Sequence, residues 1–168
     1  MLIVFGGLPA TGKSAISKAL VARRRFAYLR IDEIENALAL HGAPQREIGA
    51  EGYHVAFALA LSNLRLGNTV VADSVNPVSE SREGWRRVAE AAGAPLLEIE
   101  CICSDETEHR RRVETRVTDV AGWTLPTWDE VRSRQYEPWD TGPLVIDTAR
   151  SSVEEAVRMI EARIRETA

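Results

Sequence analysis

The stretch Gly7-Leu8-Pro9-Ala10-Thr11-Gly12-Lys13-Ser14 decides the fold of this chain. It fits the pattern G-x-x-x-x-G-K-[ST], in which the backbone N–H groups of a glycine-rich loop turn inward and surround phosphate oxygens. Residues 1–5 before it read Met-Leu-Ile-Val-Phe, an apolar run typical of a buried strand, and apolar residues recur at helical spacing after it. The motif requires this context of a strand, then a glycine loop, then a helix. The sequence therefore predicts a site for nucleotide phosphates.

Each part of this loop has an expected role. Lys13 is expected to reach the β- and γ-phosphates, and the hydroxyl of Ser14 to bind Mg²⁺. The helix that follows adds unpaired N–H donors and a partial positive charge. The residues expected to contact the nucleotide are Gly7, Leu8, Pro9, Ala10, Thr11, Gly12, Lys13, Ser14 and Ala15. ATP and Mg are the expected cofactors. An accidental glycine-rich turn is the alternative, which the complete motif disfavours.

Length and composition favour one ordinary domain. The chain has 168 residues, which suits a single domain over 1–168, and its net charge of −4 gives no basic field for nucleic acid or anionic lipid. Cys101 and Cys103 share one face of a predicted strand and are expected to be free thiols in a reducing compartment. We find neither a signal peptide nor an apolar run of membrane-spanning length, so we expect a cytoplasmic protein with no membrane partner.

Predicted strands and helices alternate along the chain. Strands are expected at 2–6, 26–31, 69–72, 96–103 and 144–146, and helices at 13–25, 34–40, 50–66, 79–93, 127–136 and from 151 onward. This alternation favours an α/β domain with a parallel sheet and right-handed crossovers.

Two acids follow predicted strands, at the edge where parallel sheets bind ligands. Asp32 follows the strand at 26–31 and could accept the proton of a substrate hydroxyl as that oxygen attacks the γ-phosphorus. It could also cap the next helix, and both roles can hold together. Asp73 follows the strand at 69–72 and could hold magnesium through water or Ser14. A turn cap is the alternative for Asp73.

The segment at about 105–126 is expected to form an arginine-rich lid. It contains Arg110, Arg111, Arg112 and Arg116, interleaved with four acids. Cations placed here could stabilise charge on a transferring phosphoryl group. The alternative is a helix whose charges only face solvent.

With these motifs the chain resembles the small P-loop kinases that are often labelled as an AAA-type ATP-binding family. That family is close to the kinase domain of polynucleotide 5′-hydroxyl kinases, and more distantly related to chloramphenicol, gluconate, adenylylsulfate and shikimate kinases. The stretches that carry the resemblance are Gly6–Ser14, Arg30–Glu33, Val70–Pro77 with Arg82 and Trp85, His109–Arg116 and Val145–Thr148. The resemblance implies a three-layer P-loop NTPase fold with a five-stranded parallel sheet in the order 2-3-1-4-5.

The resemblance also implies roles by position. Asp32 resembles the general base, Arg112 and Arg116 resemble the lid arginines, and Asp147 and Thr148 resemble the residues beside the adenine.

On the acceptor side, Asp73 and Asn76 resemble the third-strand acid and a polar residue that faces the substrate. The candidates to line the acceptor pocket, beside Asp32 and Asn76, are Arg46, Glu47, Tyr53, His54 and Arg82.

Two departures weaken the likeness to polynucleotide kinases. Those kinases usually have an arginine where this chain has Glu35, and Asp-Asn-Thr-Asn where it has Asp73-Ser-Val-Asn76. We therefore expect an ATP- and Mg-dependent phosphotransferase acting on a hydroxyl of a small molecule, such as a nucleoside, sugar or antibiotic. A polynucleotide 5′-hydroxyl kinase and a regulatory ATPase without acceptor are the alternatives. The sequence gives no expectation for the oligomeric state.

Overall fold

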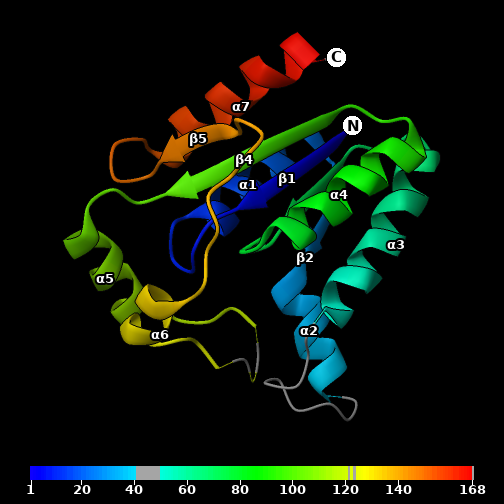
Figure 1. Ribbon diagram of the computed structural model, residues 1–168. Helices are drawn as coiled ribbons and strands as arrows, with labels where there is room; N and C mark the ends of the chain where they lie inside the picture. The colour runs from blue at the N-terminus through cyan, green and yellow to red at the C-terminus, as the bar shows by residue number, and fades with distance from the viewer. Residues whose placement is uncertain (41–49, 121, 123, 168) are drawn as a thin grey trace.

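The computed structural model describes residues 1–40, 50–120, 122 and 124–167. Five parallel strands form one sheet in the order β2-β3-β1-β4-β5, with helices on both faces (Figure 1). The strands are β1 (Leu2–Gly6), β2 (Ala27–Arg30), β3 (Val70–Asp73), β4 (Leu96–Ile102) and β5 (Leu144–Asp147). This arrangement confirms the predicted three-layer α/β fold and its strand order.

The helices in the described chain are α1 (Lys13–Arg24), α2 (Ile31–Leu40), α3 (Glu51–Arg65), α4 (Ser79–Ala92), α5 (Glu106–Thr115), α6 (Trp128–Ser133) and α7 (Val153–Thr167). Most helices begin and end close to their predicted limits, whereas α2 begins three residues earlier than expected and α5 lies in the segment that was expected to form a lid. A capping box of Thr127 and Glu130 starts α6, as predicted, but the backbone turns extended at Arg134, so this helix is shorter than expected. Across the residues described, no helix is both long and apolar enough to cross a bilayer.

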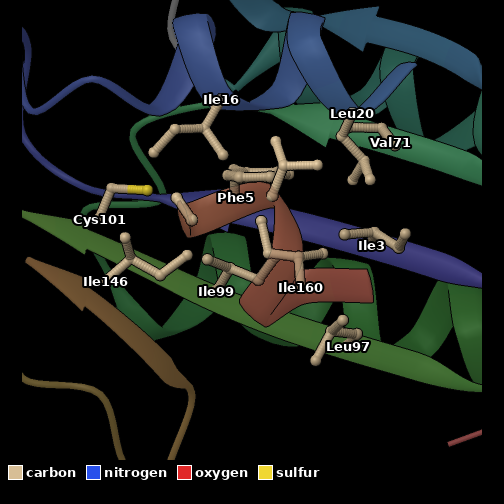
Figure 2. Packing of buried hydrophobic residues seen from close by; sticks show 12 residues of the cluster. Ile3, Phe5, Ile16, Leu20, Val71, Leu97, Ile99, Cys101, Ile146 and Ile160 are labelled. Carbon is tan, nitrogen blue, oxygen red and sulfur yellow. The ribbon is translucent and has the colours of Figure 1, made fainter. Parts of the chain in front are cut away.

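Strand residues alternate between two cores, because successive side chains of a strand point to opposite faces. Ile3 and Phe5 lie in the core beneath α1 and α7, together with Ile99 of β4 (Figure 2). Leu2 and Val4 lie in the other core, beneath α3 and α4. With both faces covered, the strands need apolar residues at almost every position, which is why they read as continuous apolar runs.

The carboxyl ends of the central strands bring the predicted site residues to one edge. Phe5 of β1 is in register with Asp73 of β3, which is in register with Arg30 of β2. The glycine loop leaves β1 at this edge, and α5 follows β4 there (Figure 1). Ile31 begins α2 rather than ending the strand, so Asp32 lies in the first turn of that helix and not at its cap.

Candidate active site

The glycine loop after β1 has the tight backbone that its sequence predicts. Gly7 and Gly12 have φ angles of 138° and 90°, which side chains rarely allow. A Cβ at Gly7 would lie 2.2 Å from the carbonyl oxygen of Cys101 in β4. Thr11 closes the turn, because its hydroxyl donates to the carbonyl oxygen of Leu8 at 2.9 Å. The loop is therefore held against the sheet in one compact conformation.

Lys13 is the first residue of α1, and its side chain is buried. Its ammonium donates to the carbonyl oxygen of Leu8 at 3.3 Å. Burial lowers the pKa of Lys13, and the charges of Asp73 and Asp32 partly offset that effect. A desolvated ammonium gains when an anion approaches it, so this lysine is well placed for a phosphate group.

Asp73 ends β3 and is 2% exposed. Its Oδ2 accepts hydrogen bonds from the hydroxyls of Tyr28 at 2.7 Å and Ser17 at 3.3 Å. Burial and the nearby Asp73 carboxylate raise the pKa of the Tyr28 hydroxyl. These side-chain partners from β2 and α1 hold Asp73 at the edge of the sheet.

The residues around Asp73 fit a magnesium ion. Its carboxylate and the hydroxyl of Ser14, a cavity-lining residue, are oxygen ligands of the kind that Mg²⁺ prefers. Within the described part of the chain, no three His, Cys, Asp or Glu side chains gather as a metal site. A magnesium ion here would therefore take its remaining ligands from water and phosphate, as is usual for nucleotide sites.

A cavity of about 1490 Å³ opens in front of the loop. Lys13 and Ser14 line it from the loop side, and Asp32 and Glu35 line it from α2. Arg116 follows the end of α5 and lines it from the predicted lid. The volume is large enough for a nucleotide and a second small molecule, since ligand pockets commonly measure ~300–1,000 Å³.

The two acids of α2 differ in their surroundings. Asp32 forms an ion pair with Arg30 at 3.6 Å, and its side chain is 38% exposed. Burial, together with the charge of Asp32, raises the pKa of Glu35 to about 7, while Arg134 acts in the opposite direction. Asp32 thus meets the cavity as a solvated carboxylate, and Glu35 as a partly desolvated one.

The two expected lid arginines are held differently. Arg112 donates to Glu108 at 2.7 Å and to the hydroxyl of Thr148 at 2.8 Å, so it ties α5 to the segment after β5. Burial lowers the pKa of Arg116, and its Nε has no hydrogen-bond partner in the part of the chain described. Arg116 is therefore the better candidate for a ligand contact, and Arg112 for a structural one.

His109 and Thr148 attach the loop to its neighbours. The Nε2 of His109 lies 2.8 Å from the carbonyl oxygen of Pro9, and its ring packs edge-on against Trp128 of α6. The hydroxyl of Thr148 lies 2.9 Å from the carbonyl oxygen of Thr11. The outer side of the loop is thus fixed to both α5 and the segment after β5.

Asn76 and Arg82 were expected to face the substrate, but the structure gives them internal partners. Asn76 is fully buried with φ 50°, and its side chain donates to Phe5 and accepts from Trp85. Arg82 is 1% exposed and donates to the carbonyl oxygens of Asn76 and Pro138 at 3.0 and 2.7 Å. Neither residue lines the cavity. Both hold internal contacts in this structure, and their role toward a substrate stays a prediction.

Asp147 and Thr148 also lie outside the cavity lining. The carboxylate of Asp147 accepts from the hydroxyl of Ser104 at 2.5 Å and from the N–H groups of Ser104 and Ala149 at 3.0 and 3.1 Å, and these bonds lower its pKa. A Cβ added at Gly12 would lie 3.2 Å from the Thr148 side chain. In this structure the pair supports the back of the loop, and its place beside an adenine remains a prediction.

Several cavity residues escaped the sequence analysis. Asp119 pairs with Lys18 and also binds Arg30 at 2.7 Å, and these bonds lower the pKa of Asp119 to about 2. Arg134 lines the cavity as well and was not among the candidates, whereas Tyr53, which was a candidate, does line it. Glu35 could have been found, because it lies three residues after Asp32 and so shares its helix face.

Three other candidates for the acceptor pocket remain. Arg46 and Glu47 lie outside the described residues. His54 is exposed on α3.

Comparison with known proteins gives a family for most of the chain. Residues 2–138 match the model of a protein family described as the AAA domain. No protein with a curated description matches the chain.

Solved structures of low sequence identity share the fold over nearly the whole chain. A protein from Chloroflexus aurantiacus, provisionally described as a kinase, is 22% identical with a TM-score of 0.79, covering 99% of this chain and 97% of that one. APS kinase from Mycobacterium tuberculosis, solved with AMPPNP and APS, is 20% identical with a TM-score of 0.71 and coverage of 98% and 96%. A gluconokinase from Sinorhizobium meliloti is 19% identical with a TM-score of 0.62 and coverage of 99% and 97%. The chain therefore has the fold of small P-loop kinases.

Proposed function

This chain belongs to the AAA domain family, and from that premise we propose that it is an ATP- and Mg-dependent phosphotransferase that moves the γ-phosphoryl group to a hydroxyl of a small molecule. One observation carries the proposal. Lys13 on the glycine loop and Asp32 on α2 line the same cavity, and the charge of Asp32 acts on the pKa of Lys13. A phosphate-binding cation and a solvated carboxylate thus face one space in which a nucleotide and an acceptor can meet.

The loop amides and Lys13 would hold the β- and γ-phosphates, and Ser14 and Asp73 would hold magnesium. Bound magnesium supplies positive charge that offsets the negative charge on the phosphate oxygens. Magnesium fits this donor set because Asp73 is anchored through one oxygen by Tyr28 and Ser17. These residues would hold the γ-phosphate in the cavity that Asp32 also lines.

Asp32 would act on the acceptor. A new bond forms between the acceptor oxygen and the γ-phosphorus, the bond from that phosphorus to the β–γ bridging oxygen breaks, and Asp32 takes the hydroxyl proton. Arg116 would place positive charge beside the transferring group, and closure of the segment at about 105–126 would exclude water. Positioning supplies most of the catalysis in phosphoryl transfer, so the contribution of Asp32 depends chiefly on its reach to the acceptor hydroxyl.

The similar solved structures support the use of a nucleotide. The identity of the acceptor is part of this proposal alone. The similar APS kinase was solved with AMPPNP, an ATP analogue, and the similar gluconokinase is named for another acceptor. A cytoplasmic location, where thiols such as Cys101 stay reduced, is part of the proposal. The polynucleotide alternative is disfavoured by the acids that line the α2 side of the cavity.

The test compares phosphoryl transfer in three variants, using labelled ATP, Mg²⁺ and a fractionated metabolite pool with mass detection of the product. Asp32→Asn should lower transfer by roughly 10²–10⁴, the usual range for loss of a general base, with ATP-analogue affinity and Tm unchanged. Lys13→Ala should abolish both transfer and tight analogue binding. Glu33→Gln is the matched control, since Glu33 is a 52% exposed side chain on the same turn and is absent from the cavity lining.

Near-normal transfer by Asp32→Asn would remove this residue from the chemistry. Hydrolysis of ATP that no pool component stimulates would instead favour the regulatory ATPase.

A further inference from the structure

Glu35 occupies the acceptor side of the cavity. It lies three residues after Asp32 on α2, so both carboxylates share one face of the helix. Both line the cavity, and Tyr53 of α3 lines it beside them. The charges of Asp32 and Glu35 also act on the Tyr53 hydroxyl, whose pKa is raised mainly by burial. Arg30 also lines this side of the cavity, where it pairs with Asp32, so Glu35 is the acid of the pair on α2 that has no ion pair among the described residues.

A glycine on the neighbouring helix makes room for Glu35. Gly52 is buried in the first turn of α3, and a Cβ added there would lie 2.6 Å from the Cγ of Glu35. The Oε1 atom of Glu35 would lie 3.2 Å from that added Cβ. The Glu35 side chain thus packs directly over Gly52. Its place at the cavity wall depends on the absence of a side chain at residue 52.

The charges around Glu35 leave its carboxylate without a close cation among the described residues. Arg30 is committed to Asp119 at 2.7 Å. Arg134, at the end of α6, lowers the pKa of Glu35 by its charge but forms no ion pair with it, and Asp32 adds a like charge. A carboxylate in this position favours a cation and repels an anion.

We propose that the acceptor carries a protonated amine as well as the reacting hydroxyl, and that Glu35 binds this ammonium. This inference rests on the phosphotransferase proposal for the same cavity. An ammonium–carboxylate pair in a partly desolvated pocket is a strong charge-assisted hydrogen bond, and it would orient the acceptor so that its hydroxyl reaches Asp32. An acidic acceptor would meet Asp32 and Glu35 as like charges. Glu35 is thus a specificity determinant that selects amino sugars, aminocyclitols or amino nucleosides over acids.

Binding of matched probes tests this directly, by calorimetry with the wild-type chain, AMPPNP and Mg²⁺. The amine probes are glucosamine, 2-deoxystreptamine and 3′-amino-3′-deoxyadenosine. Their neutral counterparts are glucose, myo-inositol and adenosine, and the acidic ones are gluconate, inositol monophosphate and adenosine monophosphate. At least one amine probe should bind about 10- to 100-fold more tightly than its neutral counterpart, the factor given by one charge-assisted hydrogen bond. Its acidic counterpart should bind most weakly.

Variants then assign the preference to Glu35. Glu35→Gln should remove the amine preference, and Gly52→Ala should weaken it by displacing an unchanged Glu35. Glu33→Gln, on the same helix turn, should preserve it. Tm measurements establish that each variant is folded.

Three results would overturn the inference. The inference fails if every amine probe binds no more tightly than its neutral counterpart. It also fails if the amine preference survives in folded Glu35→Gln. If Arg134→Gln reproduced the loss seen in Glu35→Gln, Glu35 would act by holding Arg134 instead of a ligand. Glu35-dependent binding of an amine that is never phosphorylated would count against the phosphotransferase proposal alone.

Discussion

Replacing Arg82 with methionine should unfold the protein more easily without a specific effect on the acceptor. Arg82 is 1% exposed and donates to the carbonyl oxygens of Asn76, Pro138 and Glu137, and its guanidinium lies 4.5 Å from the centre of the Trp139 ring. Three charge-assisted bonds at ~1.5 kcal/mol each give about 4.5 kcal/mol, and the apolar methionine side chain recovers ~1 kcal/mol by burial. We therefore expect the free energy of unfolding to fall by about 3–4 kcal/mol.

The assay is thermal and urea unfolding with acceptor kinetics on the same preparations. A loss of that size should lower Tm by roughly 10 °C in a domain of this length, since 1 kcal/mol shifts Tm by about 2–4 °C. Arg87→Met is the matched control, because Arg87 lies on the same helix with a 72% exposed side chain and pairs only with Glu83 in the described chain. It should change stability by less than about 0.5 kcal/mol.

An unchanged Tm in Arg82→Met, together with a raised KM for the acceptor, would refute this reasoning. It would restore Arg82 as a substrate residue.

Three further predictions concern the cavity. Asp73→Asn should raise the magnesium concentration needed for half-maximal activity, and a magnesium curve that overlays the wild type would leave Asp73 a purely structural role. Arg116→Ala should lower kcat more than ATP affinity, because its Nε, which has no partner among the described residues, is available to the transferring group, and a loss confined to affinity would assign it to ground-state binding. For Glu35, a folded-state pKa of about 7 exceeds the ordinary value of 4.5, so its ionisation opposes folding and stability is lost as pH rises through this window. Glu35→Gln should therefore gain Tm relative to wild type between pH 5 and pH 7.5, and parallel Tm curves would contradict the raised pKa.

The fold and the phosphate side of the site could be predicted because their signals are local. The loop motif, the apolar strands and the acid after β3 are each contained in a few neighbouring residues, and the parallel topology brings them to one edge. Asn76 and Arg82 could not be assigned in this way. Their roles depend on partners such as Phe5 and Pro138, 71 and 56 residues away in the sequence.

The acceptor side was harder to predict for a related physical reason. Glu35 gains its significance from Gly52 on another helix, and no periodicity within α2 indicates that contact. Arg30 likewise finds its main partner in Asp119, which lies 89 residues later.

The segment that contains α5 and α6 is fastened at both of its ends, and this limits how it can move. At its start His109 contacts the glycine loop at Pro9, and at its finish the carbonyl oxygens of Glu137 and Pro138 bind Arg82. The segment is also held at its middle, where Asp119 is bonded to Arg30 and Lys18. Arg116 and Arg134 lie on either side of Asp119 in the chain, so a swing of the whole segment that carried both arginines across the cavity would have to break these ion pairs. Enclosure of nucleotide and acceptor by such a swing would therefore be coupled to the release of Arg30 and Lys18 by Asp119.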